Sequence, residues 1–254
     1  MMDNFQKNLW RERASLGDRG VLDPADKKGL KNKYIDLTHK IILEEEMKLS
    51  TSDKVLDFGC GAGRLSSWIA NFEVSKVIGV DITPEMIDRA QENYSSKKNL
   101  KFLNYNGSKI PSSDDYFDKV LSVWVLQHIV EESKFRETIR ELGRVLKKNG
   151  QIFFIEQVMQ RNSSEKYPQT DYIYKLQRSP KNYIKTFQES GFRLIEWYPV
   201  NTGRGIFYKF IVIGLPFFLS FLTPLFVRID LFLTRWMKVS KDKYTDSFFI
   251  FKKV

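Results

Sequence analysis

The sequence is poor in the side chains that build disulfides and metal centres. Its 254 residues include one cysteine, Cys60, and two histidines, His39 and His128. A single cysteine excludes an internal disulfide and therefore the secreted, disulfide-rich scaffolds. So few thiol and imidazole groups also argue against a zinc site, and we expect no metal.

The N-terminal residues lack the apolar core of a signal peptide, so we expect a cytoplasmic protein. The length suits one α/β domain with additions. A composition of 42% hydrophobic and 28% charged residues excludes a disordered or fibrous chain. Lysine and arginine outnumber the acids by 41 to 31, a net charge of +10. This excess favours an anionic partner, which is a nucleic acid, a membrane surface or a phosphorylated substrate.

Short apolar runs alternate with helical stretches from about residue 52 onward. The runs predict strands at Lys54–Phe58, Lys76–Val80, Leu100–Asn104, Lys119–Trp124 and Gln151–Glu156, with a helix at Glu131–Leu146. Near-continuous apolar strands that alternate with helices indicate a parallel sheet covered on both faces. Phe192–Val200 and Ser247–Lys252 are expected to add a final pair of strands. We therefore expect one domain over residues 51–254.

Residues 1–50 form a separate, polar and helical segment. Leu30, Tyr34, Leu37 and Ile41 recur at the spacing of one helical face, whereas residues 16–24 contain two glycines and a proline and predict a loop. We expect the segment to act as a lid, with Arg19 and Tyr34 as candidates to contact a ligand. The alternative is a solvated arginine and a core tyrosine.

Residues 55–64, VLDFGCGAGR, are the most informative stretch of the chain. A buried strand ends beside Asp57, and the glycines let the backbone pass close to a ligand at a helix N-terminus. The dinucleotide fingerprint would need glycine where Arg64 stands, so a nicotinamide or flavin is disfavoured. Asp81 ends the second strand, where an acid can accept both ribose hydroxyls of an adenosine. Asn106 follows the third strand and could pair with an adenine edge.

In this order and spacing, the motifs resemble those of the S-adenosylmethionine-dependent methyltransferases with the seven-stranded Rossmann-like fold. The resemblance covers about residues 50–200 and the last strand. It implies a three-layer sheet, mostly parallel with an antiparallel final strand. An N-terminal helical segment precedes this sheet, and an apolar helical insertion precedes its last strand. It also implies S-adenosylmethionine as the cofactor.

The resemblance also implies the cofactor contacts. It assigns Gly59, Cys60, Gly61 and Gly63 to the methionine half of the cofactor, Asp57 to its amino group or the loop, Asp81 to the ribose, Ile82, Met86, Asn106 and Gly107 to the adenine, and Val123 to the sulfonium. The family often has aspartate where Asn106 stands, so that contact would use a different pattern of donors and acceptors. Each motif taken alone is also ordinary turn or cap chemistry.

His128 is the candidate catalytic residue, since by the resemblance it lies just past the fourth strand at the reactive end of the cofactor. A hydroxyl acceptor would benefit from a base near its proton. The alternative is a histidine that only holds its loop through hydrogen bonds. Residues 160–190 are expected to form an insertion on the acceptor side, with Tyr167, Tyr172 and Tyr174 as candidates to line the pocket or to pack.

The fourth strand is not followed by the Asp/Asn-Pro-Pro-Tyr/Phe string of methyltransferases that act on nucleobase or amide nitrogens. Residues 124–127, Trp-Val-Leu-Gln, stand there instead. This difference favours a small-molecule, glycan or lipid acceptor.

Phe210–Val227 is an uncharged run of eighteen residues, at the short end for a membrane-spanning helix. Pro216 and Pro224 would interrupt such a helix, and the chain must return to the sheet for its last strand. We therefore expect this run to lie in the membrane interface, to re-enter or to pack on protein. Its polar residues fall on one thin line of the helical wheel: Lys209, Pro216, Ser220, Thr223 and Asp230.

The insertion as a whole, residues 204–243, carries seven basic residues and two acids: Arg204, Lys209, Arg228, Arg235, Lys238, Lys241 and Lys243 against Asp230 and Asp242. Basic flanks around an apolar segment suit an anionic cytoplasmic leaflet. The alternative is a cap over the acceptor pocket or a dimer interface.

Together these features predict an S-adenosylmethionine-dependent methyltransferase that O-methylates a lipid-linked, glycan or other amphipathic small acceptor near the membrane. We expect it in the cytoplasm, peripheral at the inner face of the membrane. The alternatives are an isoprenoid quinone methyltransferase, an RNA methyltransferase that uses the charge of +10 differently, and a binding protein without catalysis. The sequence leaves the acceptor, the methylated atom and the oligomeric state open.

Overall fold

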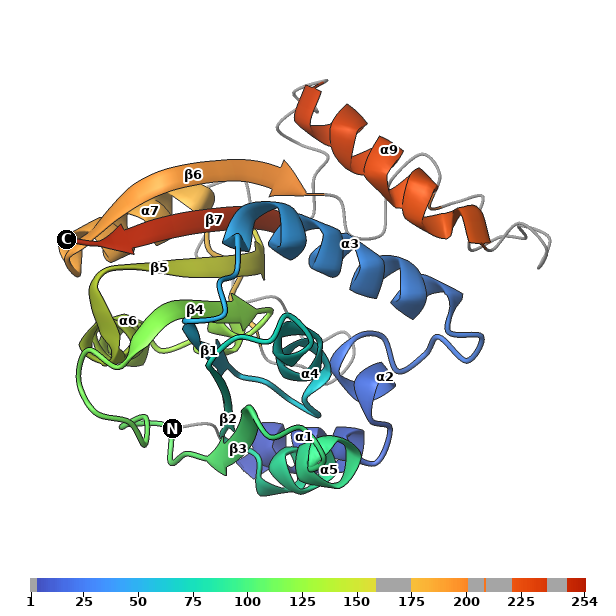
Figure 1. Ribbon diagram of the computed structural model, residues 1–254, viewed down its shortest axis with the longest axis horizontal. Helices are drawn as coiled ribbons and strands as arrows, with labels where there is room; N and C mark the ends of the chain where they lie inside the picture. The colour runs from blue at the N-terminus through green and yellow to red at the C-terminus, as the bar shows by residue number, and fades with distance from the viewer. Residues whose placement is uncertain (1–3, 159–174, 201–207, 209–220, 237–245) are drawn as a thin grey trace.

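The computed structural model describes residues 4–158, 175–200, 208, 221–236 and 246–254, which form a three-layer α/β domain (Figure 1). Its centre is a seven-stranded sheet with the order β3-β2-β1-β4-β5-β7-β6. β1 to β5 run parallel, and β7 lies antiparallel between β5 and β6. The predicted fold class, mostly parallel with an antiparallel final strand, is confirmed.

The strands lie where the apolar runs predict them: β1 (Lys54–Phe58), β2 (Lys76–Asp81), β3 (Leu100–Asn104), β4 (Phe117–Val123), β5 (Leu146–Gln157), β6 (Phe192–Val200) and β7 (Asp246–Lys253). Two ends differ for identifiable reasons. β4 stops before Trp124 because that residue has a left-handed φ of 58°, which ends extended pairing. β5 begins at Leu146, which pairs with Phe117, so the strand follows its helix directly.

Helices cover both faces of the sheet: α3 (Leu30–Met47), α4 (Arg64–Ala70) and α5 (Pro84–Tyr94) lie on one face, and α6 (Glu132–Val145) and α7 (Pro180–Glu189) on the other. Neighbouring residues of a strand point to opposite faces. Accordingly, Phe154 packs in the core beneath α6 and α7, whereas Phe153 and Ile155 pack beneath α3 and α4. Burial on both sides explains why the parallel strands are almost continuously apolar.

The N-terminal segment folds as α1 (Asn4–Ala14), the one-turn α2 (Asp18–Val21) and α3. The predicted apolar stripe exists on α3, where Tyr34 and Ile41 are buried against α9 (Thr223–Trp236). The expected loop at residues 16–24 contains α2, which the sequence prediction missed. One of its glycines, Gly20, allows a close approach to α1, because a Cβ there would meet the Arg13 carbonyl oxygen at 2.1 Å.

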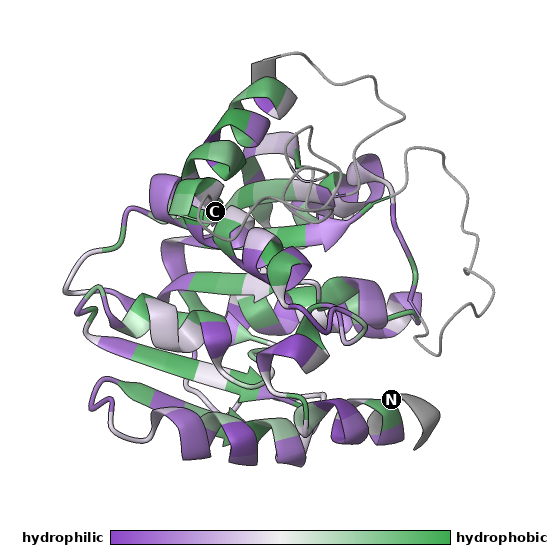
Figure 2. Cartoon of the chain, turned by 90° about the vertical axis from the view of Figure 1, so that its right-hand side faces the viewer, coloured by the Kyte–Doolittle hydropathy of each residue, from purple (hydrophilic) through white to green (hydrophobic). Residues whose placement is uncertain are grey.

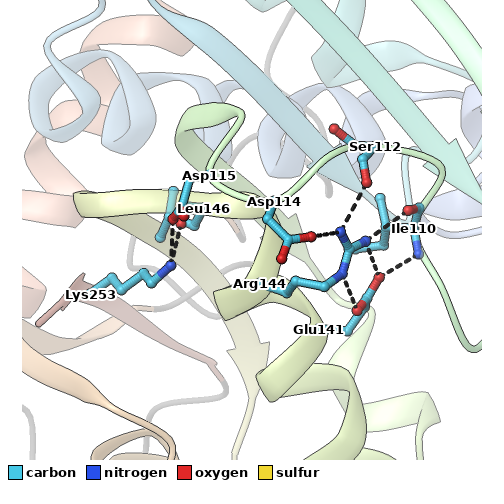
Figure 3. Close-up of polar contacts among 8 residues, drawn as sticks. All are labelled: Ile110, Ser112, Asp114, Asp115, Glu141, Arg144, Leu146 and Lys253. Atoms are coloured by element: carbon cyan, nitrogen blue, oxygen red, sulfur yellow. Dashed lines mark hydrogen bonds and ion pairs between the residues drawn. The ribbon is translucent and has the colours of Figure 1, made fainter.

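A network around Arg144 fixes the segment that leads from β3 to β4 (Figure 3). The guanidinium donates to the carbonyl oxygens of Ile110 and Ser112, each at 3.0 Å, and forms ion pairs with Asp114 and Glu141. A planar fork of donors suits several acceptors at once. The network therefore anchors the far end of the loop that begins at the carboxyl edge of the sheet.

The predicted apolar run is described only in its last part, because residues 209–220 lie outside the described residues. α9 begins at Thr223, just before Pro224 at its first turn, where proline is tolerated. None of the described helices combines the length and apolar character that a bilayer crossing requires.

Candidate active site

The order of the strands reverses between β1 and β4, which is where α/β sheets bind ligands at the carboxyl ends of their strands. A small cavity of about 40 Å³ lies at this point. It is lined by Val21, Leu22, Asp57, Gly59, Cys60, Gly61, Arg64, Leu65, Val123 and Trp124. Five of the predicted cofactor residues therefore meet at one cavity, although β1, β4 and the N-terminal segment are far apart in the sequence.

The glycine loop after β1 is bonded to the end of β2. The N–H groups of Gly59 and Cys60 donate to the Val80 carbonyl oxygen at 2.8 and 3.0 Å, and the Gly61 N–H donates to Asp81 Oδ2 at 3.0 Å. Gly61 has a φ of +52°, and a Cβ on it would lie 2.7 Å from Val21 Cγ1. Only glycine fits here, because the backbone is left-handed and Val21 of the N-terminal segment lies directly above it.

Two predicted residues of this loop are buried groups with raised pKa values. Asp57 accepts a hydrogen bond of 2.5 Å from the Ser66 hydroxyl of α4, and burial raises the pKa of its carboxyl to about 6. Burial also raises the pKa of the Cys60 thiol well above its usual value. A protonated thiol is a poor nucleophile. Asp57 therefore fixes α4 to the loop, and Cys60 acts as a small apolar side chain.

Asp81 is half-buried at the end of β2, between the two segments that it joins. Besides Gly61, its carboxylate accepts from the Thr83 N–H at 2.9 Å, at the start of α5. Burial raises the pKa of Asp81, while these N–H donors lower it. A carboxylate has about four lone-pair sites, so the two bonds leave room for ligand hydroxyls.

The predicted adenine-side residues lie on the next two loops. Met86 is buried against Ala62 and the N-terminal Ala14, and Ile82 covers Gly107, whose added Cβ would approach it to 3.0 Å. The side-chain oxygen of Asn106 accepts hydrogen bonds from its own loop, from the N–H and hydroxyl of Ser108 and the N–H of Lys109. Its amide nitrogen is therefore the group that could reach a ligand.

Glu156, at the end of β5, is a site residue that the sequence analysis missed. Its side chain is fully buried and accepts three backbone N–H bonds, from Val125 at 2.9 Å, Leu126 at 2.7 Å and Gln127 at 3.1 Å. These residues form the loop between β4 and His128. An acid at the end of an apolar strand is the only sequence signal, and the strand pairing alone shows which loop it meets.

Trp124 begins this loop in a strained conformation, since a bulky residue rarely adopts a φ of +58°. Its indole N–H donates to Asp246 Oδ1 of β7 at 2.8 Å, and its ring meets the edge of His39 with centroids 5.0 Å apart. Contacts from two other elements hold the residue in place. Strain of this kind clusters at functional sites.

His128 ends the short 3-10 helix η1 (Leu126–His128) at the same edge of the sheet. Its ring packs edge-on against Trp10 of α1, with centroids 5.3 Å apart. The buried Arg178 donates to the carbonyl oxygens of Leu126 and Ile129 at 3.3 and 2.8 Å. The segment after β5 and the N-terminal helix therefore both fix the position of this histidine.

Arg64 brings a positive charge to the cavity. Its guanidinium forms an ion pair with Asp36 of α3 and lies 3.4 Å from His39 Nδ1. The side chain is 9% exposed, so the pair is poorly screened by solvent. Arg64, which stands where the dinucleotide fingerprint has a glycine, is thus an ion-pair partner of the N-terminal segment.

Other predicted residues lie elsewhere. Tyr34 donates a hydrogen bond to Asp230 of α9 at 2.6 Å and is absent from the cavity lining. Arg19 is half-buried on α2. Tyr167, Tyr172 and Tyr174 lie outside the described residues. In the part of the chain that the structure describes, no three His, Cys, Asp or Glu side chains are grouped to hold a metal.

We expect Glu156 to make stability fall with rising pH, because burial raises its pKa to about 8 although three N–H donors lower it. Between about pH 4.5 and 8 the unfolded chain releases this proton while the folded chain keeps it, which lowers the free energy of unfolding. Urea unfolding at pH 5 and pH 8 should show a smaller loss for Glu156→Gln than for the parent. Exposed Glu12→Gln is the matched control, and equal losses in all three proteins would contradict the assignment.

Comparison with known proteins gives one family. Residues 56–154 match the family described as "Methyltransferase domain". The methyltransferase GfsG of Streptomyces halstedii is 26% identical over 113 residues, which is 43% of this chain and 40% of that protein. The demethylmenaquinone methyltransferase of Chlorobaculum tepidum is 25% identical over 61% of this chain and 72% of its own length.

Among solved structures, a chain from the complex of the Haloferax volcanii Trm112 methyltransferase activator with its methyltransferase partner has a TM-score of 0.66 at 21% identity. The match covers 96% of this chain and 97% of that one. The chain spans about half the length, or less, of the first curated relatives that it matches. The predicted resemblance to the S-adenosylmethionine-dependent methyltransferases with the seven-stranded Rossmann-like fold is nevertheless confirmed, because residues 56–154 match the methyltransferase domain and the sheet has that fold.

Proposed function

We propose that the protein binds S-adenosylmethionine at the cavity beside β1 and β4 and transfers its methyl group to a small amphipathic acceptor. The observation that carries the proposal is the bond between the Gly61 N–H and Asp81. It fixes a left-handed glycine loop beside a carboxylate at the ends of adjacent strands. This is the arrangement by which such sheets hold an adenosine and the charged group attached to it.

The predicted contacts divide between the two halves of the cofactor. Gly59, Cys60, Gly61 and Gly63 pass along the methionine half, Asp57 orients the loop, Asp81 accepts from the ribose, Ile82, Met86, Asn106 and Gly107 surround the adenine, and Val123 faces the sulfonium. Five of these residues line the cavity. The amide nitrogen of Asn106 donates to the adenine, since its oxygen is held within its own loop.

The cavity fits the chemistry of the cofactor but is closed by the N-terminal segment. A volume of about 40 Å³ holds a few water molecules, far less than a nucleoside, and Val21 and Leu22 form one wall. The glycine loop and Asp57 line the sheet side of the cavity, and Asp81 is bonded to that loop. Residues 1–50 therefore serve as a lid that opens to admit the cofactor and closes over it.

S-adenosylmethionine supplies an activated methyl group, so the protein has mainly to align an acceptor with it. His128 takes the proton of an acceptor hydroxyl as a general base. It lies at the same sheet edge as Trp124, and Glu156 fixes the loop between them. Trp10 packs against the His128 ring, and Arg178 donates hydrogen bonds to the backbone on either side of that histidine.

The acceptor is a lipid-linked, glycan or other amphipathic small molecule. The absence of the Asp/Asn-Pro-Pro-Tyr/Phe string after β4 supports this class over a nucleobase. The similarity to a demethylmenaquinone methyltransferase supports an isoprenoid quinone as a second candidate. The proposal assigns the acceptor side to residues 160–190, of which residues 160–174 lie outside the described residues. An enzyme with such a substrate acts near a membrane, and the proposal places the protein in the cytoplasm at the inner face of that membrane.

Removal of the Asp81 carboxylate should abolish cofactor binding or weaken it severely, because the ribose hydroxyls lose their acceptor. Gly61→Arg should do the same, since the side chain meets Val21 and the backbone is left-handed. Calorimetry with S-adenosylmethionine on Asp81→Ala and Gly61→Arg measures both effects. Exposed Asp88→Ala is the matched control. Native affinity in either folded variant would overturn its assigned contact.

His128→Ala should lower turnover by about a hundredfold or more while leaving cofactor affinity unchanged, as expected for a lost general base. The measurement is turnover across pH together with calorimetry of the cofactor. A histidine that only packs against Trp10 would change affinity or stability without altering the pH profile. Exposed Lys134→Ala, on the adjacent α6, is the control.

The acceptor class is tested by incubating the purified protein with labelled cofactor and, separately, membrane extract, soluble extract and RNA. We expect the label in lipid-soluble products of the membrane extract. Label in RNA would support the RNA methyltransferase instead, and water-soluble products would point to a free glycan or small molecule. No transfer to any fraction, despite cofactor binding, would favour a binding protein without catalysis.

A further inference from the structure

On an ordinary surface helix the buried side chains are apolar and the exposed ones are polar. On α9 the most deeply buried and the most exposed side chains largely reverse this pattern. Its buried residues are Thr223, Val227, Asp230 and Thr234, each at most 4% exposed. They follow one another at steps of four, three and four, which is one helical face. Three of these four are polar. The most deeply buried positions of the inward face are therefore mostly polar, with Phe226 and Leu231 packed beside them.

Hydrogen bonds satisfy this inward face. Asp230 Oδ2 accepts from the Tyr34 hydroxyl of α3 at 2.6 Å, and the Thr234 hydroxyl donates to the Asp230 carbonyl oxygen at 2.7 Å. Val227 packs between Tyr34 and Ile41. Specific polar contacts of this kind fix which side of α9 faces α3, so its outward face is equally well defined.

The outward face consists of large apolar side chains and arginines. Phe221, just before the helix, is 72% exposed, Leu225 52% and Phe232 63%. Arg228 lies three residues after Leu225, and Arg235 lies three residues after Phe232, so both arginines lie on the same stripe. We call Phe221, Leu225, Arg228, Phe232 and Arg235 the outer stripe. In Figure 2 the uppermost helix, α9, is mostly green (hydrophobic) where it stands out from the body of the molecule.

The charges of the outer stripe are all positive, since Asp230, the only acid of α9, faces inward. Arg228 pairs with Glu45 at 3.3 Å and Arg235 with Glu46 at 2.9 Å. Arg235 also pairs with Glu196 at 3.3 Å, and its guanidinium lies 4.0 Å from the centre of the Tyr198 ring. Arg228 is 54% exposed, and an exposed pair such as Arg228–Glu45 is weak and exchanges readily. Arg228 can therefore turn to another anion without loss of the fold.

A cavity of about 160 Å³ opens beside the stripe, between α9, α3 and β6. Apolar side chains, among them Ile42, Leu231 and Phe232, form part of its wall, and Arg228, Arg235 and their ion-pair partner Glu45 also line it. An apolar recess next to cationic groups matches a molecule with an apolar chain and an anionic head.

From this arrangement we infer that the outer stripe docks on an anionic lipid bilayer, with Phe221, Leu225 and Phe232 inserted among the acyl chains and the arginines at the phosphates. A second copy of the chain is a poorer partner, because a symmetric contact would bring the four arginines of two stripes together. An anionic surface complements both the apolar and the cationic residues. The inference deepens the proposed function, and rests on it for the conclusion that the acceptor is met at the membrane.

Flotation with vesicles tests the surface directly. The full chain should float with vesicles of phosphatidylcholine and phosphatidylglycerol, less at high salt, and much less with phosphatidylcholine alone. Replacing Phe221, Leu225 and Phe232 together by serine should weaken partition by at least about tenfold, because large apolar side chains stay in water. Arg228→Gln with Arg235→Gln should remove most of the preference for the anionic vesicles.

The matched controls are exposed residues elsewhere on the molecule. Phe72→Ser follows α4, and Lys101→Gln lies on β3, at the opposite edge of the sheet from β6. Both variants should float like the parent. Thermal unfolding checks that the triple serine variant is folded, and the arginine pair keeps the test decisive if it is not.

Three results would overturn the inference: a parent protein that ignores anionic vesicles, a folded triple variant that floats like the parent, or a dimer that this variant dissociates. Cofactor calorimetry on the same samples separates a failure of the docking surface from a failure of the proposed function. Lost flotation with intact cofactor affinity supports the docking surface. Intact flotation without cofactor affinity would leave the surface and refute the methyltransferase site.

Discussion

Carboxylates at the carboxyl edge of the sheet must be satisfied by hydrogen-bond donors, because burying an unpaired charge costs several kcal/mol. Asp57 takes the Ser66 hydroxyl, Asp81 takes two backbone N–H groups, and Glu156 takes three. Each acid thereby fixes the path of a neighbouring loop. The glycine loop, the start of α5 and the loop before His128 all depend on this single requirement. Of the three acids, Asp57 itself lines the cavity.

The cavity therefore has two walls of different origin. The sheet edge is held by hydrogen bonds to the buried acids Asp57, Asp81 and Glu156. The opposite wall is made by Val21 and Leu22, which come from the N-terminal segment. Under the proposed function, a cofactor larger than the cavity displaces this second wall and leaves the sheet edge in place.

α3 connects the site to the outer surface. On one face of the helix, Asp36 and His39 contact Arg64 at the cavity, and on another Tyr34 bonds to Asp230 of α9. The polar inward face of α9 is thus explained by what it meets, a buried tyrosine on α3. With these polar groups used inside, the helix leaves Leu225 and Phe232 outward. The same helix that supports the cofactor loop therefore orients the outer stripe.

The sequence by itself determined the sheet, since apolar runs buried on both faces admit few alternatives. It also determined the glycine loop and Asp81, because left-handed turns and acids at strand ends are local features. It could not show that Glu156 meets residues 125–127, because that contact joins neighbouring strands about thirty positions apart. Nor could it orient α9: Thr223 and Asp230 form the predicted polar line, but a helical wheel does not say which side faces the protein. Only the packing of α9 on Tyr34 decided that, because a buried hydroxyl and carboxylate are stable there when bonded to each other.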